Sequence, residues 1–279
     1  MCDAAEYKRH KELFRKSSKT YYYSSVFFPS EVRCDVFRLY SFVRTADNYV
    51  DSIPQQTEEF YSFLAEYRKA LRGEPTDNQI IDAFVSLSKR KNFEPAWTDA
   101  FLQSMEWDLS RSEYETEEEM LKYIYGSAEV IGLYMSAILG LSAKAHRAAV
   151  FQGRAMQLIN FIRDIDEDNG FGRRYLPSAE TDLLDLSYAS AQKNPKEFER
   201  YIRFQIDRYR QWQAEATKGF SFLPRRYRIP VSVAADMYNW TASVIWKDPF
   251  VVFSRKVKPG KLRVFRKVLW RLFFPAKRK

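Results

Sequence analysis

Hydrophobic residues recur with a spacing near 3.6 along almost the whole chain, and this periodicity constrains the fold more than any other feature. The pattern is clear over residues 36–50, 60–71 and 198–209. Strict alternation is rare, and the run Pro230-Val-Ser-Val233 is too short to build a sheet. The sequence therefore predicts an all-α protein, with long surface helices over residues 62–73 and 196–219.

Turn-forming and helix-breaking residues divide the chain into segments. Breaks are expected near residues 29, 52–54, 73–75, 92–95, 111–116, 170–172, 194–195, 223–230 and 258–260. Gly and Pro are scarce, at 9 and 11 in 279 residues. The longest apolar run, residues 130–143, is shorter than the roughly 18 residues of a bilayer span and reads as a buried core helix. We expect a single-domain helical bundle around a central cavity.

The excess positive charge of the chain is concentrated at its C-terminal end. The net charge is +9, and residues 255–279 hold eleven Lys or Arg and no Asp or Glu, so 9 minus 11 leaves −2 for residues 1–254. A nucleic-acid binder would carry a basic surface and a recognition motif on its folded body, so no nucleic-acid partner is expected. The charged N-terminus is unlike a secretory signal, and we expect a cytoplasmic protein.

Residue usage excludes several classes of chemistry. The two cysteines form no CxxC pair, and there are only two histidines, which gives a zinc site no support. The chain contains no P-loop, no G-x-G-x-x-G stretch and no G-x-S-x-G elbow. Nucleotide-binding folds and serine hydrolases therefore lack their usual signatures here.

Two acidic ladders interrupt strongly hydrophobic segments. In the first, Asp47 and Asp51 are four residues apart; in the second, Asn160, Asp164 and Asp168 repeat the same spacing. Residues at i and i+4 share a helix face, where like charges destabilise the helix. A single D-x-x-x-D pair is common on solvated faces, but the second ladder lies within Leu-Ile-x-Phe-Ile and precedes Gly-Arg-Arg-Tyr-Leu-Pro, residues 172–177.

A metal ion would compensate such stacked carboxylates. Mg²⁺ prefers oxygen ligands and typically takes one or two carboxylates together with substrate phosphates. Two facing ladders could hold several ions and, through them, a diphosphate. Arg44 and Arg173 could complete the anion clamp, because arginine forks match phosphate oxygens.

These segments resemble the squalene and phytoene synthase family, and bacterial-type phytoene synthases most. Residues 44–51 resemble the first aspartate-rich motif of the family, and residues 157–177 resemble the second. Further similar segments are Ser18-Lys-Thr-Tyr21, Tyr123-Ile-Tyr-Gly-Ser-Ala128 and Val252-Phe-Ser-Arg-Lys-Val257. The resemblance spans about residues 14–260 and implies a class I isoprenoid synthase domain over residues 1–260, followed by a basic amphipathic tail over 261–279.

The resemblance also implies roles for individual residues. The Mg²⁺ ligands would be Asp47, Asp51, Asn160, Asp164 and Asp168, with Mn²⁺ able to substitute. The residues that contact substrate would be Ser18, Lys19, Arg44, Tyr123, Gln157, Asn160, Arg173 and Tyr175. Of these, Arg44, Tyr123 and Tyr175 would take part in catalysis. Arg163 either shares in this role or pairs with a neighbouring carboxylate.

The implied reaction joins two geranylgeranyl diphosphates head to head, through a cyclopropylcarbinyl diphosphate, to phytoene, without NADPH. Family enzymes that make squalene, dehydrosqualene or presqualene diphosphate from farnesyl diphosphate share the motifs and remain alternatives. A terpene cyclase or head-to-tail prenyltransferase would show Asp-Asp-x-x-Asp, whereas position 48 is Asn. A non-catalytic relative acting as an assembly factor would be expected to lose some aspartates, and all are present.

The tail predicts contact with a membrane surface. Phe265, Val268-Leu269 and Leu272-Phe273 alternate with basic residues, which is typical of an interfacial helix, and Trp270 suits the same setting. The product would be a water-insoluble hydrocarbon, so a peripheral location and a downstream desaturase as partner are expected. The alternative is that Phe265, Leu269 and Phe273 pack onto the bundle and the basic residues are merely solvated.

Overall fold

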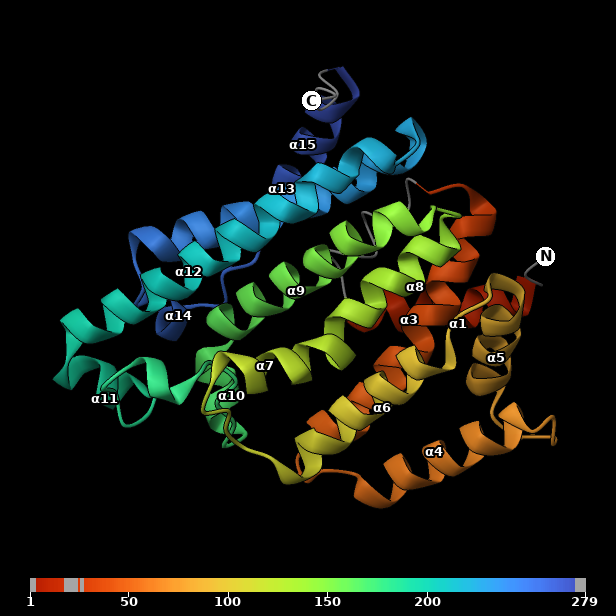
Figure 1. The fold of residues 1–279 in the computed structure, drawn as a ribbon, viewed down its shortest axis with the longest axis horizontal. Helices are drawn as coiled ribbons and strands as arrows, with labels where there is room; N and C mark the ends of the chain where they lie inside the picture. The colour runs from red at the N-terminus through yellow and green to blue at the C-terminus, as the bar shows by residue number, and fades with distance from the viewer. Residues whose placement is uncertain (1–3, 18–24, 26–27, 274–279) are drawn as a thin grey trace.

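The computed structural model describes residues 4–17, 25 and 28–273. These residues form an elongated bundle of α-helices (Figure 1). Among them, the β interactions are limited to one bridge between Glu113 and Arg174. The all-α prediction is confirmed. The α-helices are α1 (Ala4–Ser17), α3 (Ser30–Asp51), α4 (Thr57–Leu71), α5 (Gln79–Lys91), α6 (Pro95–Ser110), α7 (Glu117–Ile124), α8 (Val130–Ile138), α9 (His146–Arg163), α10 (Ile165–Gly170), α11 (Tyr188–Lys193), α12 (Pro195–Lys218), α13 (Arg225–Lys247), α14 (Val251–Ser254) and α15 (Lys261–Phe273).

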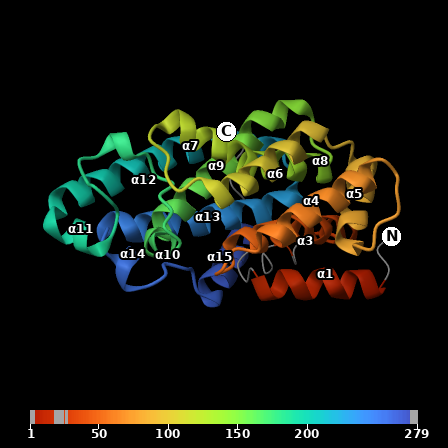
Figure 2. The ribbon, with the colours of Figure 1, turned by 90° about the horizontal axis from the view of Figure 1, so that it is seen from below.

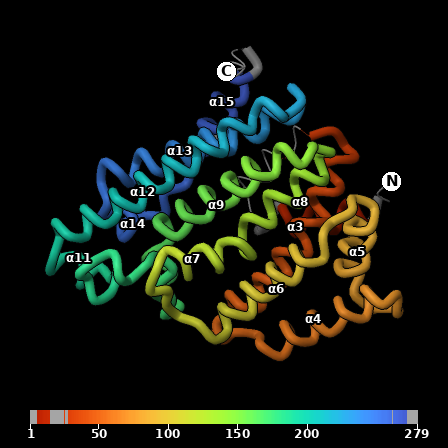
Figure 3. The backbone as a smooth tube through the Cα atoms, viewed as in Figure 1, coloured from red at the N-terminus to blue at the C-terminus, as the bar shows by residue number. Residues whose placement is uncertain are grey.

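Helix α9 runs through the middle of the bundle and packs against α8 and α12 (Figures 1 and 3). Helices α3, α6 and α8 form one side with α4 and α5 outside them, and α12 and α13 form the other. Helix α1 lies across α3 along one face, at the lower edge of Figure 2. A five-residue π-helix, Tyr125–Glu129, joins α7 to α8.

The core consists of two main clusters that meet along α8 and α9. One is built around Phe42 and Phe84, whose rings stack 3.8 Å apart, and it joins α3 to α6 and α8. The other is built around Ile159 and Tyr201 and joins α7, α9, α12 and α13. Each aspartate ladder therefore lies on a helix that is anchored in a different cluster.

Local sequence explains many of the helix ends. The side chain of Asn78 accepts hydrogen bonds from the amides of Ile80 and Ile81 and caps α5. Thr116 caps α7 through the amide of Glu119. Helices α6 and α12 begin with proline at the first helical position, where a missing amide proton has little cost. The long helix predicted over residues 196–219 is confirmed as Pro195–Lys218, whereas the one predicted over 62–73 begins earlier, at Thr57.

Two of the predicted boundaries were placed wrongly. The break expected over residues 223–230 ends at Pro224, and Pro230 is buried inside α13. A proline near a helix start removes one backbone hydrogen bond, and burial of the surrounding face of α13 offsets that loss. The apolar run 130–143 is a buried helix only as far as Ile138, because Gly140 adopts a left-handed conformation with φ of 65°.

The final helix packs against the body of the protein. Val264 and Val268 of α15 are buried with Val233 and Met237 of α13. The guanidinium of Arg271 forms a 2.9 Å ion pair with Asp236. None of the helices in the described ranges is long and apolar enough to cross a bilayer.

Candidate active site

The first aspartate motif lies in the last two turns of α3. Asp47 and Asp51 project from the same face, and Arg44 donates a hydrogen bond to the carboxylate of Asp47. Burial, followed by the negative charge of Asp51, raises the pKa of Asp47 to about 7. The chain therefore holds a carboxylate here whose negative charge is only partly compensated.

The second motif continues through a kink between α9 and α10. Asp164 has φ of −101° at the junction, yet the 2.8 Å hydrogen bonds from Asp164 N to Asn160 O and from Asp168 N to Asp164 O keep the helical spacing. The predicted i, i+4 ladder of Asn160, Asp164 and Asp168 is thus present. The Nδ2 of Asn160 lies 3.5 Å from Gln157 Oε1, which places Gln157 on the same face.

The carboxylates of the second ladder have opposite electrostatic settings. Burial would raise the pKa of Asp164, but the adjoining Arg163 and then Lys256 outweigh it and lower that pKa. Arg163 Nε donates to Asp164 over 2.9 Å, and Lys256 Nζ lies 3.3 Å from it. Burial and the charges of Asp164 and Asp51 raise the pKa of Asp168 to about 8. Arg163 therefore pairs with a carboxylate, which was one of its two predicted roles.

Arg173 connects the two motifs. Its Nη1 donates to Asp51 over 2.8 Å, and its Nη2 donates to the carbonyl of Val50 over 2.6 Å. Its own amide donates to the carbonyl of Asp168 over 2.9 Å. Gly172, with φ of 69°, makes the turn that directs Arg173 back toward α3. The two ladders, 109 or more residues apart in sequence, therefore meet around one guanidinium.

A buried aspartate that the sequence analysis missed lies beside this guanidinium. Asp108 in α6 accepts hydrogen bonds from the hydroxyls of Tyr123 and Tyr175, at 2.7 and 2.8 Å. Its backbone carbonyl accepts from Arg173 and Gln55. Burial raises the pKa of Asp108 to about 6, although Arg173 and both tyrosines lower it. The only local signal was an acidic residue between Trp107 and Leu109 on a hydrophobic helix.

Tyr123 and Tyr175 belong to an aromatic wall. Their ring centroids are 5.0 Å apart, and the ring of Tyr175 stacks on Phe161 at 4.4 Å. Burial raises the pKa of both phenols well above the usual value, so the hydroxyls remain protonated hydrogen-bond donors. The π-helix begins two residues after Tyr123, and π-helical turns frequently mark functional sites.

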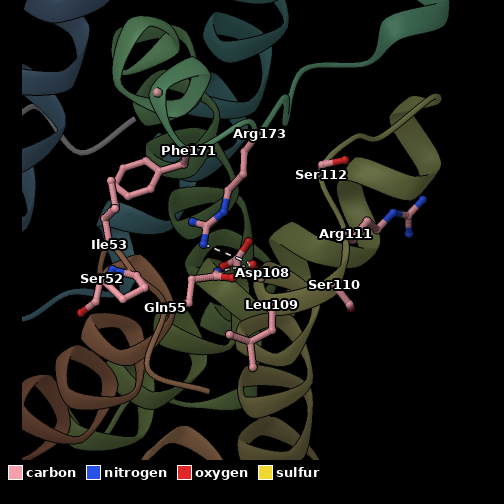
Figure 4. Close-up of a pocket in the computed structure, with 12 residues that line it drawn as sticks. Ser52, Ile53, Gln55, Asp108, Leu109, Ser110, Arg111, Ser112, Phe171 and Arg173 are labelled. Carbon is pink, nitrogen blue, oxygen red and sulfur yellow. Dashed lines mark hydrogen bonds between the residues drawn. The ribbon is translucent and has the colours of Figure 1, made fainter. Parts of the chain in front are cut away.

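Two open cavities flank the meeting point of the motifs. One, of about 360 Å³, lies between the 52–55 loop, the end of α6 and the 170–173 turn. Within it Arg173 and Gln55 converge on Asp108, and Arg111 points away (Figure 4). The other, of about 580 Å³, is lined by Arg44 and Asp51 from α3 and by Leu13 from α1.

The residues present fit a divalent ion that is shared with a substrate. Asn160 Oδ1 is buried and has no hydrogen-bond partner among the described residues. An unpartnered amide oxygen one turn before Asp164 is suited to a hard cation. The described residues contain no group of three acidic, His or Cys side chains close enough to hold a metal by themselves. The aspartates predicted as metal ligands are therefore not gathered into such a group in the described part of the structure.

Some predicted positions fall outside the described residues. Ser18 and Lys19 belong to residues 18–24, so their place at the site stays a prediction. Lys256 was missed as a candidate, although its segment had been singled out. It reaches the second motif, where it forms ion pairs with Asp164 and Glu167.

A family model described as squalene/phytoene synthase matches residues 14–263. The chain belongs to the squalene/phytoene synthase family. It is 28% identical over 284 residues to the 15-cis-phytoene synthase of Synechocystis sp., with 95% of this chain and 84% of that protein covered. It is also 28% identical to the chloroplastic phytoene synthase of Daucus carota, over 92% of this chain and 67% of that protein.

Solved structures of the family share the fold. A dehydrosqualene synthase in complex with ligand superposes with a TM-score of 0.84 at 20% identity, covering 96% of this chain and 95% of that one. The squalene synthase HpnC from Alicyclobacillus acidocaldarius gives 0.77 at 20% identity, covering 88% and 94%. The predicted isoprenoid synthase fold is confirmed.

Proposed function

We propose that this chain is a Mg²⁺-dependent prenyltransferase that joins two geranylgeranyl diphosphates head to head to give phytoene. The observation that carries the proposal is the meeting of the two aspartate motifs around Arg173, which links Asp51 to the backbone of Asp168. The phytoene synthases of Synechocystis and Daucus carota among its relatives support the choice of product.

The metal ligands would be Asp47 and Asp51 on one side and Asn160, Asp164 and Asp168 on the other. Mg²⁺ bound there would neutralise the diphosphate as it leaves the allylic carbon. The raised pKa values of Asp47 and Asp168 and the buried, unpartnered Asn160 Oδ1 support this assignment. Mn²⁺ is expected to replace Mg²⁺.

The chain's own residues would bind and orient the diphosphates. Arg44 is held at one end of the first motif by Asp47, so its remaining guanidinium donors are available to phosphate oxygens. Arg173 already donates through both terminal nitrogens to Asp51, Tyr175 and two backbone carbonyls, so its Nε is the donor left for phosphate. Gln157 and Asn160 present amides on the facing ladder. Leaving-group stabilisation by fixed donors needs no nucleophilic side chain.

The aromatic wall would protect the cationic intermediates from water. A carbocation formed by ionisation, and again after the cyclopropylcarbinyl diphosphate ionises, is attracted to ring faces. Tyr123, Tyr175 and Phe161 pack together in a buried aromatic cluster beside the motifs, which keeps water out of this side of the site. The hydroxyls of Tyr123 and Tyr175 are oriented by Asp108, so the two phenols serve as fixed dipoles.

Farnesyl diphosphate is the second candidate substrate. The structural match to a dehydrosqualene synthase, over 96% of this chain, favours it. The test is product analysis with each diphosphate, in Mg²⁺ and in excess chelator. Phytoene from geranylgeranyl diphosphate, lost in chelator, is the expected result. A C30 product from farnesyl diphosphate alone would move the assignment to the dehydrosqualene or squalene group. No product from either substrate would favour a non-catalytic assembly role.

A membrane surface is proposed as the site of product delivery. Val264 and Val268 turn toward α13, and large apolar side chains elsewhere on α15 are exposed. The apolar side chains exposed on it are Leu262, Phe265, Leu269 and Trp270. Arg263 and Arg266 on the same helix are exposed and suit an anionic lipid surface. Phe265 and Leu269 are therefore exposed, whereas the alternative would have packed them onto the bundle. The side chain of Phe273 lies outside the described residues.

A further inference from the structure

Asp108 accepts hydrogen bonds from Tyr123, Tyr175 and Arg173. Its side chain is 6% exposed, and both of its oxygens accept from phenols, Oδ2 from Tyr123 and Oδ1 from Tyr175. The tyrosines come from α7 and from the segment after the second motif. A carboxylate on a third helix therefore fixes two hydroxyls that are 52 residues apart in sequence.

We propose that Asp108 is a positioning residue for the condensation, acting through the hydroxyls of Tyr123 and Tyr175. This inference rests on the proposed function. A phenol has a single proton, and donating it to a buried carboxylate stops rotation of the hydroxyl. The hydroxyl of Tyr175 also accepts from Arg173 Nη1 over 3.3 Å, so it is fixed from both sides.

The side chain and the backbone of Asp108 have separate tasks. The side chain holds the tyrosines, whereas the backbone carbonyl accepts from Arg173 over 3.2 Å and from Gln55 over 2.8 Å (Figure 4). Arg173 and Gln55 also donate to the carbonyl of Val50 at the end of the first motif. A substitution of the side chain therefore leaves the backbone contacts of Arg173 in place and reaches this arginine only through the 3.3 Å hydrogen bond from its Nη1 to the Tyr175 hydroxyl.

Neighbouring contacts make α6 a rigid support for this carboxylate. Ser104, one turn earlier on α6, donates to the carbonyl of Tyr123 over 3.0 Å. A Cβ at Gly126 would lie 2.1 Å from the carbonyl oxygen of Ala100, so α6 and the π-helix touch along their backbones. Because the backbones are in contact, the distance between Asp108 and Tyr123 has little freedom to vary.

The test compares Asp108→Asn with the unaltered full-length protein, using turnover of geranylgeranyl and farnesyl diphosphate in Mg²⁺. Asn keeps the shape but must offer an NH₂ group to one phenol, which misorients that hydroxyl. We expect kcat to fall about 10- to 100-fold, the size of effect that misplacement of reacting groups produces. KM is expected to change by less than about 3-fold, because Arg173 keeps its backbone partners.

Two further measurements separate positioning from a structural role. Binding of inorganic diphosphate with Mg²⁺, followed by calorimetry, should be nearly equal in both proteins. In a Tyr123→Phe/Tyr175→Phe background, adding Asp108→Asn should cost less than about 3-fold in kcat, because the groups through which it acts are gone. Tyr114→Phe is the matched control. The ring of Tyr114 is buried, and its centroid lies 5.9 Å from that of Tyr175. Its hydroxyl has no hydrogen-bond partner among the described residues, so kcat of this variant should not change.

Unchanged kcat in Asp108→Asn, or an equal loss in the double-Phe background, would overturn the inference. If Asp108→Asn does not fold, Tyr175→Phe decides by itself, and wild-type kcat in that variant overturns the proposal. A wild-type protein that binds diphosphate with Mg²⁺ but turns over neither substrate contradicts the proposed function instead. In that case, if Asp108→Asn binds diphosphate as tightly as the wild type, the result still supports separate tasks for the side chain and the backbone carbonyl of Asp108.

Discussion

At the scale of single residues, the carboxylates of the two motifs differ in how far the chain compensates them. Arg163 and Lys256 lower the pKa of Asp164, whereas burial and neighbouring carboxylates raise the pKa of Asp47 and Asp168. The charged forms of the latter two oppose folding, because a raised pKa means that the folded state favours the neutral form. Such residues are costly to keep unless a cation binds them.

Replacing Asp47 or Asp164 by Asn should remove most activity without unfolding the protein. Each substitution deletes a proposed metal ligand, so we expect a loss of more than about 100-fold in kcat/KM. Asp47→Asn should melt no lower than the wild type, because it also removes a charge that opposes folding at pH 7. Turnover and thermal melting followed by circular dichroism measure both effects.

Asp77→Asn is the matched control for these variants, since Asp77 is exposed in the loop between α4 and α5. It should keep wild-type turnover and melting. Full activity in Asp47→Asn or Asp164→Asn would contradict the metal assignment.

At the scale of elements, the turn after α10 places Arg173. The amide of Gly172 donates to the carbonyl of Asn169 over 3.0 Å, and the φ of 69° at Gly172 is one that L residues other than Gly rarely adopt. Gly140 has a similar φ of 65° after α8. A Cβ added at either glycine would have no neighbouring atom within 4 Å. A methyl group there would therefore cause conformational strain but no steric clash.

Gly172→Ala and Gly140→Ala should therefore lose similar stability but differ in activity. We expect each to lower the free energy of unfolding by about 1 kcal/mol. Relief of that strain at Gly172 moves Arg173, so its turnover should fall about 10-fold, while Gly140→Ala keeps its turnover. Urea unfolding and steady-state kinetics provide the comparison. Equal activity in both variants would show that this turn does not orient the arginine.

The exposed face of α15 predicts binding to anionic vesicles. Phe265→Ser/Leu269→Ser removes two apolar side chains that are 58% and 40% exposed, and leaves the buried Val264 and Val268 intact. Each large side chain inserted into a bilayer contributes about 1.5–3 kcal/mol, so affinity for vesicles should fall more than 10-fold. Co-sedimentation with phosphatidylserine-containing vesicles at low salt measures the effect.

Leu184→Ser is the control for the vesicle measurement, because Leu184 is 90% exposed in the loop before α11. It should bind vesicles as the wild type does. If the α15 variant also binds like the wild type, the helix is not the membrane contact.

At the scale of the whole molecule, the two core clusters place one motif on each side of the site. Helix α3 is anchored in the first cluster and α9 in the second, and α8 packs against both helices. The candidate active site is therefore formed where the two halves of the bundle pack together. We therefore expect substitutions in either cluster to change the separation of the ladders.

The proposed product requires no external reductant. In phytoene formation the final cation loses a proton, whereas squalene formation needs hydride. Geranylgeranyl diphosphate, Mg²⁺ and NADPH are supplied together. We expect phytoene to form with no decrease in the absorbance of NADPH. Squalene from farnesyl diphosphate that accumulates only with NADPH would contradict this prediction.

Local pattern was enough to predict the helices and the two ladders. The i, i+4 spacing of Asp47 and Asp51, and of Asn160, Asp164 and Asp168, follows from helix geometry alone and survives even the kink at Asp164. Proline and capping residues marked most helix ends, because their effect on the backbone is also local. The family followed from these motifs, because their chemistry depends on residues that are close in sequence.

Only the tertiary structure decided which groups meet. Asp108 gave a weak local signal, yet packing of α6 against α7 and the 173–175 segment buries it between two phenols. Packing also determined that Lys256 reaches Asp164 and that Pro230 lies inside α13. On α15, it was packing that left Phe265 exposed while Val268 is buried. Burial and long-range contact depend on the sum of many weak apolar interactions between distant segments, and no single stretch of sequence contains that sum.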